Sequence, residues 1–337
     1  MRTYLDCIPC FVKQALGAAR QVTDDEVLIE RVMKRVCLAA SELSMTESSP
    51  VMGQKIHRII REETGCGDPY AEIKKLSNEM AMRMVDGAKA EIEAAKQVGN
   101  EVSGFEVAVR YAIAGNSMDF AIYLEWDEKR LNDSLAVLRE KVIDKQAVAD
   151  LWEAIGKAEK ILVLADNAGE IVFDRLLMET LPAKVLPRIT YAVKGSAVIN
   201  DALREDADEV GVSDLVTVID NGTDAPGTVL EQCSDEFMKA YHEADVVISK
   251  GQANYETLRA SCEMTCSLSN GSLRKKRISH EPASDCFTGH MTRNDATCSS
   301  GCDREVYFLL QVKCPIIGKY VDQGKEVGDW VVQRYRP

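Results

Sequence analysis

Acidic, amide and lysine side chains follow four short apolar runs in the second half of the chain. Each run ends in an ionisable residue that a glycine follows within three positions: Asp166, Lys194, Asp220 and Lys250. After the first run, Asn167 and Glu170 add further oxygen atoms. Carboxylate and carboxamide oxygens suit hard divalent cations, whereas lysine suits phosphate. The pattern predicts a divalent metal ion that bridges the protein to a phosphate ester.

A further acid, Asp201, follows the second run after a short loop. It precedes the segment ALRED, where a helix can begin, and a helix N-terminus offers free N–H groups to an anion. Asp220 is interpreted as a turn former or helix cap, which is common for a single Asp after a strand. The group of Asp166, Asn167 and Glu170 holds more oxygen donors than one cap needs, which favours a ligand site.

The elements that must position these residues are predicted from the alternation of apolar runs with helical segments after residue 160. The runs are KILVLAD, RITYAVK, DLVTVID, ADVVISK and EVYFLLQVK. Such alternation is typical of parallel strands joined by crossover helices. The carboxyl ends of parallel strands lie along one edge, where ligands bind. We therefore expect an α/β fold with a Rossmann-like, mostly parallel sheet that gathers the four run ends.

Residues 1–150 are predicted to form a helical N-terminal region, because apolar residues recur three and four positions apart. An α/β domain that carries the predicted site for a metal ion and a phosphate ester is expected over 151–337. Residues 259–302 are rich in Ser, Thr, Cys and Asn and lack periodicity, so they are interpreted as an irregular insertion.

The composition restricts the classes of partner. The chain of 337 residues has 41 basic and 54 acidic residues, with a net charge of −13. This balance argues against a nucleic-acid binder, which needs a basic surface. Because no run approaches the ~18 apolar residues of a membrane span, we expect no membrane partner. The N-terminal residues do not resemble a secretory signal, and we expect a cytoplasmic protein. The sequence leaves the oligomeric state open.

Eleven cysteines are expected to be mostly reduced in the cytoplasm. Cys7 and Cys10 form a CxxC motif, which can be a redox pair, half of a metal site or two packing residues on a helix. A partnership with Cys37 or Cys66, in a metal site or a disulfide, stays open. The insertion holds further candidate zinc ligands without the usual two-residue spacing: Cys262, Cys266, Cys298, Cys302, His280 and His290.

Six motifs together resemble the DUF89 family, also called damage-control phosphatases or the ARMT1-like domain family. They are CIPC at 7–10, GCGDPY at 65–70, GNSMD at 115–119, DNAGE at 166–170, DNGTDAPGT at 220–228 and KGQANYETL at 250–258. The resemblance covers 1–258 and 303–337 and is closest to the archaeal and bacterial branch with an N-terminal CxxC. It implies a metal-dependent phosphatase that acts on sugar phosphates or damaged metabolite phosphates.

The resemblance also implies roles for individual residues. It places one divalent ion (Mn, Mg, Co or Ni) on Asp166, Asn167 and Asp201, and a phosphate contact on Lys250. In the expected hydrolysis, Lys194 assists Lys250 at the phosphate oxygens, and Asp201 or Glu170 acts as the base for the attacking water. Further contacts to the substrate are expected from four residues: Asn116, Asp119, Gly251 and Asn254.

Two other functions stay open. An S-adenosylmethionine-dependent carboxyl methyltransferase, an activity attributed to part of this family, would need a glycine-rich loop after the first strand. The segment DNAGEIVFD instead has one glycine and an acidic turn. A non-catalytic protein that binds a metal or a sugar phosphate is compatible with the same residues. Chelation separates phosphatase from methyltransferase activity, because methyl transfer need not depend on a metal.

Overall fold

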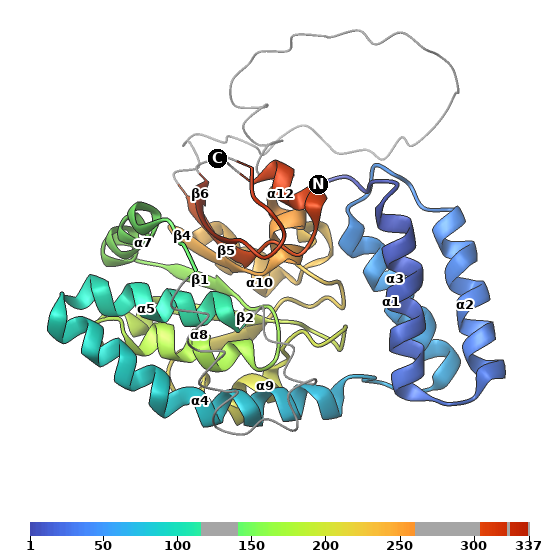
Figure 1. Cartoon of the computed structure of the whole chain (residues 1–337), viewed down its shortest axis with the longest axis horizontal. Helices are drawn as coiled ribbons and strands as arrows, with labels where there is room; N and C mark the ends of the chain where they lie inside the picture. Colours follow the sequence, from blue (N-terminus) through green and yellow to red (C-terminus); the bar gives the residue numbers. More distant parts are fainter. Residues whose placement is uncertain (116–140, 260–303, 322–323, 336–337) are drawn as a thin grey trace, which may run out of the picture.

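The computed structural model describes residues 1–115, 141–259, 304–321 and 324–335. A central sheet carries helices on both faces, and a group of three helices lies to one side (Figure 1). Asn116 and Asp119 lie outside the described residues, as does the predicted insertion beyond Arg259. Within the described part of the chain, no helix is long and apolar enough to cross a membrane.

The six strands form one sheet with the order β3-β2-β1-β4-β5-β6. They are β1 (Ile161–Leu164), β2 (Ile189–Val193), β3 (Thr217–Asp220), β4 (Val246–Lys250), β5 (Glu305–Gln311) and β6 (Trp330–Tyr335). All neighbours pair in parallel except β5 and β6. In chain order, β1, β2 and β3 extend the sheet in one direction, and β4, β5 and β6 extend it in the other. The topological switch point therefore lies between β1 and β4. The predicted fold class is confirmed, and the antiparallel β6 is an addition.

Alternate residues of each strand face opposite cores, as the pleat of a strand requires. Val163 and Tyr191 face one core and Leu162 and Ala192 the other. The first core is covered by α4 (Ala71–Val98), α5 (Glu101–Ala114), α7 (Lys145–Lys157), α8 (Glu170–Glu179) and α9 (Arg204–Glu209). The second is covered by α10 (Asp235–Glu243), α12 (Pro315–Tyr320) and the helical residues 252–258.

The first three helices have a core of their own. They are α1 (Cys7–Val22), α2 (Glu26–Ser41) and α3 (Ser49–Thr64), and their buried residues, such as Phe11, Val32 and Ile56, form a separate cluster. In contrast, Phe105 of α5 belongs to the core of the sheet. The helical N-terminal region is confirmed, while a domain boundary at residue 150 stays a prediction.

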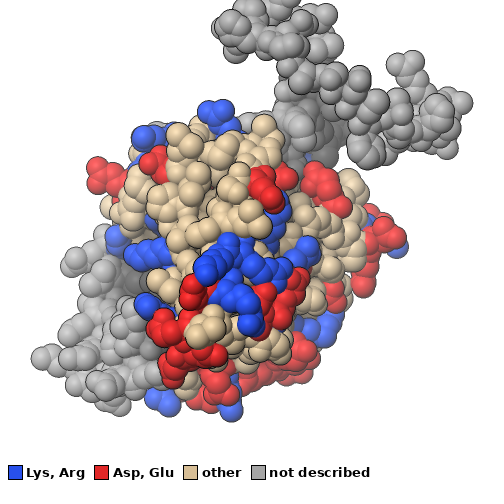
Figure 2. Space-filling model, turned by 90° about the vertical axis from the view of Figure 1, so that its right-hand side faces the viewer, with Lys and Arg blue, Asp and Glu red and all other residues tan. Residues whose placement is uncertain are grey.

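Ion pairs between partly exposed arginines and the largely buried Asp224 attach α3 to the loop after β3. Arg58 Nη2 lies 2.6 Å from Asp224 Oδ1, and Arg61 Nη2 lies 2.5 Å from Asp224 Oδ2. Burial opposes ionisation of Asp224, but hydrogen bonds from Arg58 and Gln54 outweigh it and lower the pKa of Asp224 to about 2. The face of the molecule toward the three helices carries basic side chains next to acidic ones (Figure 2). The ion pairs of Asp224 with Arg58 and Arg61 hold α3 beside the carboxyl edge of the sheet.

Candidate active site

The four predicted run ends lie along one edge of the sheet. They terminate β3, β2, β1 and β4, which are adjacent and parallel. At the end of β3, Asp220 Oδ1 accepts a hydrogen bond of 2.9 Å from the Gly222 N–H, so its interpretation as a turn former is confirmed. The other three ends surround the switch point, where open α/β sheets bind ligands.

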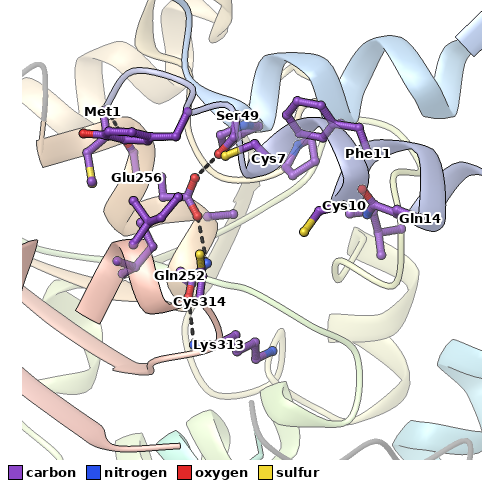
Figure 3. A pocket seen from close by; sticks show the side chains of 18 of the residues that line it. Met1, Cys7, Cys10, Phe11, Gln14, Ser49, Gln252, Glu256, Lys313 and Cys314 are labelled. Carbon is purple, nitrogen blue, oxygen red and sulfur yellow. Dashed lines mark hydrogen bonds between the residues drawn. The ribbon is translucent and has the colours of Figure 1, made fainter. Parts of the chain in front are cut away.

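A cavity of about 410 Å³ opens at this edge (Figure 3). One side is formed by Asp166, Asn167 and Asp201, which we call the acidic edge. The opposite side is formed by α1 and α3 and is called the helical wall, with Cys7, Cys10, Phe11, Gln14, Ser49 and Gly53. A third side is formed by Gln252, Glu256, Lys313 and Cys314. Elements far apart in the sequence therefore enclose one space of a size suited to a small molecule.

Backbone contacts join the two loops that carry the acidic edge. Asn167 and Asp201 pair in an isolated antiparallel bridge, and the Ala202 N–H donates to the Asp166 carbonyl at 2.8 Å. Asn167 Nδ2 donates to Asp166 Oδ2 at 3.0 Å. The structure thus brings together the three residues that the sequence predicts as metal ligands.

The acidic edge is buried and electrostatically crowded. Burial, followed by the carboxylates of Glu170 and Asp201, raises the pKa of Asp166 to about 8. Burial also raises the pKa of Asp201 to about 6, although Lys194 opposes the shift. Both values apply without a metal ion, and a bound cation would favour the ionised carboxylates.

The donor set at the acidic edge fits a hard divalent cation. Asp201 Oδ2 is buried and makes no hydrogen bond within the described structure, although it lies 3.4 Å from Lys194 Nζ. No three His, Cys, Asp or Glu side chains form a possible metal cluster in the described residues. The candidate metal ligands are therefore not three carboxylates: they are the two carboxylates of Asp166 and Asp201 together with the carboxamide of Asn167. Oxygen ligands of these types suit Mg²⁺ or Mn²⁺.

The two predicted phosphate lysines are buried and have protein partners. Lys194 Nζ donates to the Gly227 carbonyl and pairs with Asp201. Lys250 Nζ lies 2.5 Å from Glu170 Oε1 and also pairs with Asp174. In the described structure, neither lysine nor Glu170 is among the residues that line the cavity. Their roles in phosphate binding and base catalysis stay predictions.

The predicted substrate contacts Gly251 and Asn254 lie behind the acidic edge. Gly251 has φ +79° and faces the Asp166 carboxylate. Asn254 is fully buried, and its Nδ2 donates to the Ala165 carbonyl at 3.0 Å. Within the described structure neither residue lines the cavity, and a direct contact with substrate stays a prediction.

Sequence reasoning missed Lys313, which lines the cavity just after β5. Its charge lowers the pKa of both Asp166 and Asp201, against the larger effect of burial. The backbone N–H of Lys313 donates a hydrogen bond of 2.9 Å to Gln252 Oε1. Gln252 in turn donates to the Glu256 carboxylate, which also accepts a hydrogen bond from Ser49 (Figure 3). The signal was available, because Lys313 ends the fifth apolar run, EVYFLLQVK, as other charged residues end the first four.

Three thiols also line the cavity. Cys7 and Cys10 begin α1 on the helical wall, and Cys314 follows Lys313. Burial raises the pKa of the Cys7 thiol. Cys7, Cys10, Cys37 and Cys66 are free cysteines in the structure. The CxxC motif thus contributes to the same cavity as the acidic edge.

Comparisons with known proteins identify the family. The model of the damage-control phosphatase ARMT1-like domain matches residues 3–327. A damage-control phosphatase of Pyrococcus horikoshii is 33% identical over 265 residues, 77% of this chain and 86% of that protein. A damage-control phosphatase of Archaeoglobus fulgidus is 29% identical over 97% of each chain.

A solved structure agrees with these sequence matches. The crystal structure of a DUF89 family protein from Pyrococcus horikoshii has a TM-score of 0.74, with 27% identity over 99% of each chain. The resemblance inferred from the motifs is confirmed, and with it the prediction of a phosphatase that acts on small or damaged phosphometabolites. This chain belongs to the damage-control phosphatase family with an ARMT1-like domain.

Proposed function

We propose that this chain is a divalent-metal-dependent phosphomonoesterase whose active site is the cavity at the carboxyl edge of the sheet. The observation that carries the proposal is the convergence of Asp166, Asn167 and Asp201 on that cavity, where Asp201 Oδ2 is buried and, within the described residues, has the Lys194 ammonium at 3.4 Å but no hydrogen bond. The substrate class is a small phosphate ester, such as a sugar phosphate or a damaged metabolite phosphate. A cytoplasmic location and the absence of nucleic-acid partners stay predictions.

Asp166, Asn167 and Asp201 would hold the metal ion, and Mn²⁺, Mg²⁺, Co²⁺ and Ni²⁺ are the candidates. When bound, the ion supplies Lewis-acid stabilisation of the negative charge on a phosphoryl oxygen. Burial, and then the carboxylates of Glu170 and Asp201, raise the pKa of Asp166, so its ionised form depends on compensation by positive charge. A metal-dependent site explains why acids are placed so close together.

Other residues of the chain act on the phosphate and the water. Lys313 lines the cavity. Its ammonium group is placed to compensate the negative charge that develops on the phosphate oxygens during phosphoryl transfer to water. Of the two predicted bases, Asp201 lines the cavity, whereas Glu170 is fully buried beside Lys250. The geometry therefore favours Asp201 as the group that accepts a proton from the attacking water.

The test is a panel of phosphate monoesters assayed with Mg²⁺, Mn²⁺, Co²⁺ and Ni²⁺ separately, before and after chelation. We expect turnover that chelator abolishes and that added metal restores. Asp166→Asn should lose metal-dependent turnover while its circular dichroism spectrum is retained. Asp220→Asn is the matched control, because Asp220 also ends a strand of this edge but forms a turn outside the cavity lining.

Two results would contradict the proposal. One is phosphatase activity that persists in chelated enzyme with no residual metal. The other is a folded Asp166→Asn variant that keeps near wild-type, metal-dependent turnover. Consumption of S-adenosylmethionine, unaffected by chelator, would support the methyltransferase instead.

A further inference from the structure

We propose that Lys250, Gly251 and Asn254 form a support that positions the acidic edge, and that Lys250 acts through Glu170 without touching the phosphate. The inference rests on the proposed function, because it assigns these residues to the geometry of that metal site. It changes their expected roles from substrate contacts to positioning residues.

The ammonium group of Lys250 has no donor left for a ligand. An ammonium has three N–H donors, and Lys250 Nζ donates to the Ala112 carbonyl at 2.9 Å, to Glu170 Oε1 at 2.5 Å and to Asp174. The side chain is fully buried. All three donors are therefore directed into the protein, away from the cavity.

Lys250 is connected to the acidic edge through Glu170. While Glu170 Oε1 pairs with Lys250, Glu170 Oε2 makes long contacts of 3.5 Å to the backbone N and to Nδ2 of Asn167. Glu170 has no exposed surface, and a buried carboxylate requires a compensating charge. Lys250 supplies that charge, so it keeps Glu170 in place beside the predicted ligand.

Gly251 allows the Asp166 carboxylate to pack directly against the backbone of β4. A Cβ atom at position 251 would lie 1.9 Å from Asp166 Oδ2, far inside van der Waals contact. The positive φ of +79° is a second reason for glycine at this point. Any side chain here would displace Asp166 from its position on the acidic edge.

Asn254 ties the ends of β1 and β4 together. Its Nδ2 donates to the Ala165 carbonyl at 3.0 Å and to the Lys250 carbonyl at 2.7 Å, and its Oδ1 accepts from Thr228 Oγ1 at 2.8 Å. Ala165 directly precedes Asp166. The amide therefore fixes the backbone across the switch point.

The experiment measures Mn²⁺ affinity by titration calorimetry, together with the KM for a phosphate ester at saturating Mn²⁺. Lys250→Met and Gly251→Ala should each weaken Mn²⁺ binding by about 10–100-fold, which is typical for loss of groups that orient metal ligands. Their KM at saturating Mn²⁺ should stay near the wild-type value. Lys313→Met is the comparison, because loss of a direct phosphate contact should lower steady-state turnover, while Mn²⁺ affinity should change less than in the Lys250→Met and Gly251→Ala variants.

A neutral variant keeps the test valid if Lys250→Met does not fold. Lys250→Met with Glu170→Gln and Asp174→Asn removes the three charges together, so no buried charge is left uncompensated. We expect this variant to fold and still to bind Mn²⁺ more weakly than the wild type. Gly251→Ala provides a separate measurement that leaves the three charges in place.

The two proposals fail in different ways. Wild-type Mn²⁺ affinity in folded Lys250→Met and Gly251→Ala, with a raised KM for the ester, would overturn the inference and leave the proposed function intact. A wild-type protein that binds no divalent ion above the level of Asp201→Asn would overturn both.

Discussion

The acidic edge and the helical wall face each other across one cavity, but they are held in different ways. The acidic edge lies on groups that are fully buried and paired, such as Lys250 with Glu170. The helical wall is attached through side chains, including the partly exposed Arg58 with Asp224. Separate cores lie behind the two regions. The difference suggests a division of roles, with reaction geometry set by the sheet and the fit of the substrate set by the helices.

The largest expected effect follows from breaking the support of the acidic edge. Lys250→Met should lower the free energy of unfolding by about 3–5 kcal/mol, because it leaves Glu170 and Asp174 without their buried partner. Urea denaturation measures this change. The variant that also carries Glu170→Gln and Asp174→Asn should regain most of the loss, and failure to regain it would argue against charge compensation as the cause.

Lys313→Met should produce the next largest effect, on turnover. Loss of one group that stabilises developing charge typically lowers kcat by about 10²–10³-fold. Steady-state kinetics at saturating metal give the value, and thermal unfolding should show little change because this side chain faces the cavity. An unchanged kcat would place the phosphate elsewhere in the cavity.

Asp224→Asn should weaken the attachment of the helical wall while sparing the chemistry. We expect a loss of about 1–3 kcal/mol in unfolding free energy, a raised KM and a nearly unchanged kcat. A kcat that falls in parallel with Mn²⁺ affinity would contradict the separation of the two regions.

The same variant gives a pH dependence of known sign. The pKa of Asp224 is lowered to about 2 in the folded state, below the ordinary value of about 3.9. Its stabilising contribution is therefore complete above pH ~4 and is lost as the pH falls toward 2. The difference in unfolding free energy between wild type and Asp224→Asn should therefore shrink as the pH falls from about 4 to about 2. Urea denaturation of both proteins at each pH measures it.

The smallest effect is expected from Arg31→Ala on α2. Arg31 pairs with Glu63 at the surface, and neither residue lines the cavity in the described structure. Exposed ion pairs contribute little to stability, so kcat, KM and Mn²⁺ affinity should all match the wild type. A changed KM would show that the helical wall transmits distant changes to the cavity.

The sequence was sufficient to predict which strand ends meet at this edge of the sheet, because the signal is local. Asp166, Lys194 and Lys250 each end a short apolar run, and parallel pairing then brings those ends together. The same rule would have found Lys313. It did not reveal β6, whose antiparallel place beside β5 depends on tertiary pairing.

The support and the attachment of the wall could not be predicted, because their partners are distant in the sequence. Lys250 bonds the Ala112 carbonyl across 138 positions, and Arg58 reaches Asp224 across 166. Helical periodicity predicts that α5 buries one face, but it does not specify the sheet as the surface that covers it. A lysine after a strand consequently suggests a phosphate contact until its buried partners are known.

The most direct test of the metal site is a calorimetric titration of Mn²⁺ into wild type, Asp166→Asn and Asp201→Asn, with phosphatase turnover measured on the same samples. The account predicts one ion per wild-type chain and loss of both binding and turnover in the two variants, each of which should remain folded. Tight binding of Mn²⁺ in both variants, together with undiminished turnover, would contradict it.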